Sequence, residues 1–148
     1  MNRKTLILLG FALILAATQA LASDRAGFAR LEAEMDSARQ VEADVFAPKT
    51  WEKAMEAYRK AQEDIQKNRK QKDLDKHVSE AAEYTANAVK ASEVCRLSLQ
   101  EYLDPRERAL AAEGPQRVPE LYGEAEEQFV KATKKVEEGD VKDALKEA

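Results

Sequence analysis

Residues that commonly carry catalysis or bind metals are scarce in this chain of 148 residues. It contains one histidine, His77, and one cysteine, Cys95. Metal sites usually need several nitrogen or sulfur ligands, and none of the five glycines forms a phosphate-binding loop motif. His77 is therefore expected to be a titratable residue on a solvated helix start. We expect no catalytic residue, no metal site, no cofactor and no enzyme activity.

The single cysteine excludes a disulfide bond within one chain. We expect Cys95 to be a small buried hydrophobic residue in a helix. The alternative is a disulfide between two chains, which an oxidising compartment would permit.

A strongly basic composition and runs of strand-forming residues are both lacking. Lys and Arg number 24 and Asp and Glu number 28, which gives a formal net charge of −4. With no basic stripe, the sequence argues against nucleic acid as a partner. Charged residues make up 35% of the chain, and the length fits one helical domain.

The first 22 residues differ from the rest and predict a cleaved signal peptide. Arg3 and Lys4 give a positive start, and an apolar stretch follows over Leu6–Ala17. Ala20 and Ala22 supply small residues at the −3 and −1 positions of a signal-peptidase site, which places cleavage after Ala22. The apolar stretch is short for a membrane span. We expect an exported, periplasmic chain with no stable membrane span after cleavage; the alternative is an uncleaved anchor.

The mature part of the chain uses one pattern twice, at an offset of 71 residues. In the first repeat the pattern is Pro48, Trp51, Ala54, Tyr58, Ala61 and Ile65, and in the second it is Pro119, Tyr122, Ala125, Phe129, Ala132 and Val136. The spacings of 3, 3, 4, 3 and 4 place each set on one helix face. We expect each face to be buried, with large residues filling the gaps beside alanines. The alternative is two unrelated amphipathic helices.

Both ends of each repeat helix are signalled. Proline suits the first turn of a helix because its missing N–H has no partner there. Asn68 and Gly139 stand where a left-handed C-terminal cap is wanted. Two helices of about 18 residues each, or about five turns, are therefore predicted.

Further helices are predicted around the repeats. A first helix is expected over residues 24–45 with Asp24 as its cap, and the longest helix over Leu74–Leu103. Asp104-Pro105 either kinks that helix or caps a short one ending near Glu113. A last helix begins at Val141.

These boundaries define the expected organisation of the chain. Residues 1–22 are the signal peptide and residues 23–148 the helical repeat domain, with the first repeat at about 48–113 and the second at about 119–148. Leu145 is the counterpart of Leu74, so the second repeat stops soon after its companion helix begins. We expect a truncated second repeat in a piece of a longer protein, with a deliberately short repeat as the alternative. Because part of the Tyr122–Phe129 stripe then lacks a partner, weak self-association is expected.

The pattern Ala47-Pro48-x-x-Trp51-x-x-Ala54-x-x-x-Tyr58-x-x-Ala61, repeated over Pro119–Ala132, resembles an alanine-rich helical-repeat family of the bacterial envelope. In that family the repeats follow a signal peptide and often precede an OmpA-like peptidoglycan-binding domain. The run Gly139-Asp140-x-x-x-Ala144 is similar to the start of the second helix in tetratricopeptide-type repeats. This sequence has no OmpA-like domain, so peptidoglycan binding and functional residues are not carried over.

The sequence predicts an all-α fold of long antiparallel helical hairpins, in a bundle or a TPR-like open stack. The expected function is a non-catalytic interaction or spacer module of the cell envelope, with a protein or envelope partner. The alternative is a periplasmic holdase or amphipathic lipid-binding protein.

Overall fold

The computed structural model describes residues 26–147, and their regular structure is helical, which confirms the all-α class. The helices are one over residues 26–40, then α2 (Ala43–Phe46), α3 (Pro48–Gln66), α4 (Gln71–Ser98), α5 (Gln100–Ala111), α6 (Gly114–Arg117), α7 (Pro119–Glu137) and α8 (Val141–Glu147). The predicted signal peptide and Asp24 lie outside the described residues. None of the helices in the described part combines the length and apolar character needed to cross a membrane.

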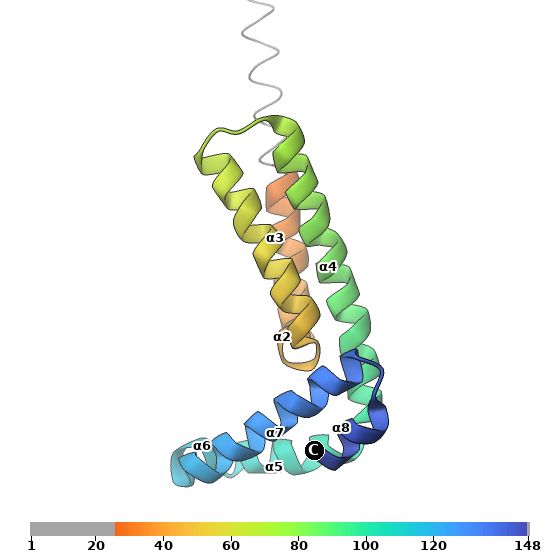
Figure 1. The fold of residues 1–148 in the computed structure, drawn as a ribbon. Helices are drawn as coiled ribbons and strands as arrows, with labels where there is room; N and C mark the ends of the chain where they lie inside the picture. Colours follow the sequence, from red (N-terminus) through yellow and green to blue (C-terminus); the bar gives the residue numbers. More distant parts are fainter. Residues whose placement is uncertain (1–25, 148) are drawn as a thin grey trace, which may run out of the picture.

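The helices pack into a bundle with two arms. The helix over residues 26–40 lies beside α3 and α4, and α5 to α8 lie across the lower end of these three helices (Figure 1). Leu31 and Met35 of the first helix share a buried cluster with Ala57 of α3 and Ala81 of α4. One core therefore joins all three helices of the first arm.

Alanine residues line the contact between α3 and α4. Ala54, Ala57 and Ala61 of α3 are buried, as are Ala81 and Ala88 of α4. A side chain of one methyl group lets two helix backbones approach closely, and close-packed interiors gain dispersion energy from such contacts. This stripe fixes the spacing of the two longest helices in the first arm.

The two repeat helices begin at proline, as predicted, and each has 19 residues. The repeat in backbone conformation begins six residues before the prolines that open the sequence pattern. Glu42 and Glu113 both adopt the left-handed conformation, with φ of 53° and 58°. Ala47 and Val118, just before the prolines, have φ of −138° and −140°. A proline disfavours the α-helical conformation for the residue before it, which accounts for the second pair.

The repeat also includes the turn after each helix. Asn68 has φ of 47° and Gly139 has φ of 84°, so both predicted left-handed caps are confirmed. The Arg69 N–H donates to the Asp64 carbonyl at 2.9 Å, and the Asp140 N–H donates to the Lys135 carbonyl at 2.9 Å. This six-residue bond is the mark of a Schellman turn, which satisfies carbonyls left free at a helix end.

Three predicted helix boundaries were wrong. The helix predicted over residues 24–45 ends at residue 40, because Glu42 is left-handed and cannot continue an α-helix. The helix predicted over Leu74–Leu103 begins earlier, at Gln71, and breaks at Leu99, which is fully buried. Asp104 and Pro105 then lie inside α5, and the short helix ends at Ala111.

Contacts from α7 hold the second arm against the first. The Phe46 and Phe129 rings meet edge to face with centroids 5.7 Å apart. The Glu137 carboxylate accepts hydrogen bonds from the Lys49 and Thr50 backbone N–H groups at 2.8 and 3.0 Å. These N–H groups lie in the first turn of α3, where no helix carbonyl can accept from them. Glu137 therefore acts as the N-terminal cap of α3 from another helix.

A pair of glycine substitutions tests the backbone assignment. Gly139→Ala should destabilise the protein by about 1 kcal/mol, because an L-residue with a side chain is strained at positive φ. Gly123→Ala in α7 is the matched control: its added methyl group meets no atom within 4 Å and should stabilise the helix by about 0.5–1 kcal/mol. Urea unfolding measures both. Equal effects of the two changes would contradict the assignment.

Candidate functional site

The predicted repeat face is only partly buried in the first repeat. Ala54 and Ala61 are fully buried, while Pro48, Trp51 and Tyr58 are half-buried. Ile65 is 43% exposed, so its predicted burial was wrong. The buried residue at that end of α3 is Asp64, because the buried positions Ala54, Ala57, Ala61 and Asp64 keep to the side facing α4.

In the second repeat a different part of the face is buried. Phe129, Ala132 and Val136 are buried, but Tyr122 is half-buried and Pro119 and Ala125 are exposed. Only the position of Ala61 and Ala132 is fully buried in both repeats. The expectation that both helices bury the same ridge was therefore wrong. Within residues 26–147, no helix covers the first half of α7 as α4 covers α3 in the first repeat.

An apolar groove lies between the helix over residues 26–40 and α4. We name it the alanine groove; its volume is about 660 Å³. The apolar residues that line it are Ala33, Ala38, Val41, Ala82, Ala86 and Val89. Arg30, Glu34 and Lys90 stand along it as the charged lining residues. The sequence-based prediction did not include this surface, although alanines spaced by three and four residues on α4 are its signal.

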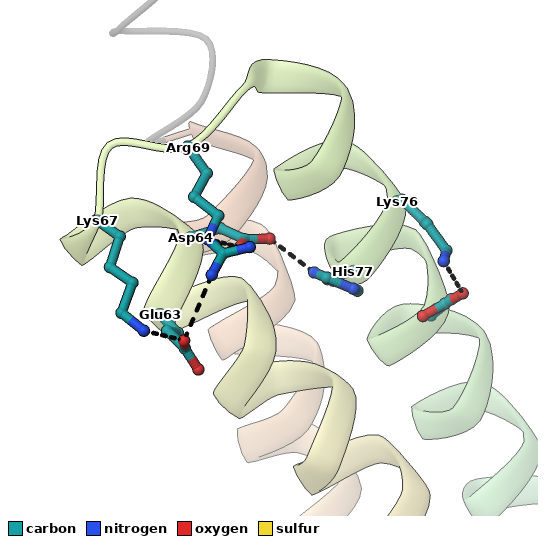
Figure 2. A network of polar contacts seen from close by, with 7 residues as sticks. Glu63, Asp64, Lys67, Arg69, Lys76 and His77 are labelled. Atoms are coloured by element: carbon teal, nitrogen blue, oxygen red, sulfur yellow. Dashed lines mark hydrogen bonds and ion pairs between the residues drawn. The ribbon is translucent and has the colours of Figure 1, made fainter.

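A polar cluster lies where α3 turns into α4, with Glu63, Lys67 and Arg69 around a buried carboxylate (Figure 2). The Asp64 side chain is 5% exposed, and its Oδ2 lies 2.6 Å from Nδ1 of His77. Its Oδ1 lies 3.6 Å from Nε of Arg69. The cluster ties the end of α3 to the second turn of α4.

The sequence analysis expected His77 to be a solvated residue, and this was wrong. His77 is the partner of a buried carboxylate. The prediction missed Asp64 because it placed the next residue, Ile65, on the buried face of α3. Its signal is the three-residue step after Ala61, on the buried side of α3. Among residues 26–147, no three His, Cys, Asp or Glu side chains lie where they could hold a metal ion.

Cys95 is a buried core residue, as predicted. It shares a cluster with Phe46, Leu99 and Phe129. Burial raises the pKa of the thiol to about 12, with a smaller contribution from the Glu137 carboxylate. The thiol is therefore protonated at neutral pH, and a thiol in that form is a poor nucleophile.

A comparison with protein-family models found no match, and comparisons with curated proteins and with solved structures found none either. The resemblance to envelope helical repeats therefore stays a prediction.

Removing the partner of Asp64 tests the polar cluster. His77→Ala should lower the free energy of unfolding by about 1–3 kcal/mol, because it deprives a buried carboxylate of its nearest partner. Lys76→Ala is the matched control, since Lys76 pairs with Glu80 on an exposed face and such pairs contribute at most about 1 kcal/mol. Urea unfolding at pH 7 measures both variants. A His77→Ala protein as stable as Lys76→Ala would show that the cluster contributes nothing.

Proposed function

We propose that this protein is a non-catalytic helical interaction or spacer module of the cell envelope. The observation that carries the proposal is the alanine groove. An amphipathic helix can lay its apolar side into such a groove, which is a common mode of peptide recognition.

The chemistry of the groove favours a helix as the occupant. The short side chains of Ala33, Ala82 and Ala86 let the backbone of a third helix approach the helix over residues 26–40 and α4 at the same time. Arg30 pairs with Glu34 at 2.8 Å, which leaves Lys90 as the net positive charge beside the apolar lining. A helix with an apolar stripe and acidic residues beside it would complement this surface.

A spacer role is supported by the way the two arms are joined. One residue, Leu99, separates α4 from α5, and Glu137 caps α3 from the other arm. Few freely rotating residues lie between the arms. A protein built in this way holds two surfaces at a fixed separation.

Export is part of the proposal and rests on the sequence of residues 1–22. The mature chain should begin at Ser23. Intact mass measurement of the protein recovered from the periplasm of an expressing bacterium checks this. A mass that includes residues 1–22, or a chain retained in the cytoplasm, would contradict export.

The groove itself is tested by two substitutions on α4. Ala86→Arg places a long cation in the alanine groove and should reduce partner recovery from envelope extract about tenfold, the change that 1.4 kcal/mol produces. Asn87→Arg adds the same charge at the next residue, which is exposed and does not line the groove, and should leave recovery unchanged. No enriched partner with the unaltered protein, or equal recovery with both variants, would overturn the proposal.

The apolar lining of the same groove favours one other candidate function, a holdase or lipid-binding protein. Dye binding to exposed apolar surface and suppression of client aggregation distinguish the two. A holdase would suppress aggregation of unrelated unfolded proteins, whereas an interaction module would not.

A further inference from the structure

A second groove lies between α5 and α7, in the second repeat. We name it the tyrosine groove; its volume is about 190 Å³, and it is lined mainly by Tyr102, Ala109, Tyr122, Ala125 and Phe129. Arg106 and Glu126 meet across it through two hydrogen bonds of 2.8 and 3.0 Å. This ion pair and the aromatic rings hold the two helices together.

The internal repeat gives each lining residue a counterpart in the first repeat. At the offset of 71 residues, these counterparts are Leu31, Ala38, Trp51, Ala54 and Tyr58. Leu31, Ala38 and Ala54 are buried. Ala125, the counterpart of Ala54, is exposed. Phe129, by contrast, is buried where Tyr58 is half-buried. The end of the surface around Ala109 and Ala125 is therefore covered in the first repeat and open in the second.

The first repeat shows which kind of element covers this surface. Ala81 of α4 packs with Leu31 and Met35, and Ala88 packs with Ala38 and Ala47. The buried residues along this stretch of α4 are all small, spaced by four, three and four positions: Ala81, Thr85, Ala88 and Ser92. The occupant in the first repeat is thus a helix with a stripe of small residues.

In the second repeat α8 stands at the counterpart of the first turns of α4. It packs on α7 through the buried Ala144, and the Tyr102 hydroxyl donates to the Leu145 carbonyl at 3.1 Å. Its described length does not extend to the part of the groove near Ala109 and Ala125. That part corresponds to the surface that Ala81 and Ala88 cover in the first repeat.

Two lining residues of the tyrosine groove are charged where the first repeat has methionine, but they leave room for a helix in the groove. Arg106 and Glu126 replace Met35 and Met55. Their charges already satisfy each other in a two-bond pair, and Arg106 also lies 5.2 Å from the centre of the Phe129 ring. A small residue above this pair, as Ala81 lies above Met35, would leave both hydrogen bonds intact.

We propose that the tyrosine groove binds an α-helix of a partner protein, one whose docking stripe carries small residues spaced by four, three and four positions. The helix lies across α5 and α7 as α4 lies across the first helix and α3. This inference deepens the proposed interaction function and rests on it. The alanine groove and the tyrosine groove share no lining residue, so the proposal for one can be tested separately from the proposal for the other.

The probe is a labelled peptide of this chain's own residues 71–98, added to the full-length protein under reducing conditions. We expect saturable binding in fluorescence anisotropy. Ala125→Arg should weaken it at least about tenfold, or 1.4 kcal/mol. Gln128→Arg is the matched control, because it adds the same charge to α7 at an exposed residue outside the groove and should leave binding unchanged. A peptide with Ala81→Arg and Ala88→Arg should not bind.

Trp51, the only tryptophan, reports on the first repeat. Binding at the tyrosine groove should leave its emission unchanged, whereas displacement of the protein's own α4 would alter it. Absence of binding, equal affinity of the Ala125→Arg and Gln128→Arg proteins, or a change in Trp51 emission would overturn the inference. The weak self-association expected from the sequence is the competing explanation of this surface. A dimer of the chain alone that Ala125→Arg abolishes in sedimentation would identify a second copy as the occupant and overturn the inference too.

These outcomes are separable from the test of the proposed function. If the peptide does not bind but the protein still recovers a partner through the alanine groove, only the inference on the tyrosine groove is overturned. If the unaltered protein recovers no partner, the proposed interaction function is overturned.

Discussion

The close contact of α3 with α4 through alanine is the constraint on which the first arm depends. Ala57 and Ala81 share one buried cluster with Leu31 and Met35, and Ala88 shares another with Ala38. The small alanines therefore let α4 cover the first helix as well as α3. The same spacing sets Asp64 within 2.6 Å of His77. A larger residue anywhere along this stripe would have to move a whole helix, and overpacking of this kind typically costs about 1–3 kcal/mol.

The two repeats share a backbone but use it differently. The turn at Glu42 and Glu113, the proline starts and the Schellman turns occur at matching positions. The buried side chains do not match, because α3 has α4 beside it along its full length and α7 has α8 only near its end. Conformation here follows from local sequence, whereas burial follows from which neighbour is present.

That difference separates what the sequence could predict from what it could not. The starts at Pro48 and Pro119 and the caps at Asn68 and Gly139 are encoded by single residues with strong conformational preferences. The break at Leu99 and the burial of Asp64 depend on distant contacts, with α7 and with His77. The alanine groove was not predicted, and of the tyrosine groove only the unpartnered Tyr122–Phe129 stripe was, since each groove is formed by two helices that are not adjacent in sequence.

The matching conformation of residues 42 and 113 also bears on how such a chain could change its length. Joining the residue before Glu42 to Glu113, or the reverse, would place the same turn and the same proline helix after the junction. A gene for this protein could therefore lose or duplicate the intervening segment by unequal recombination without creating a strained joint. The number of units is then a variable that selection can adjust independently of the sequence within each unit.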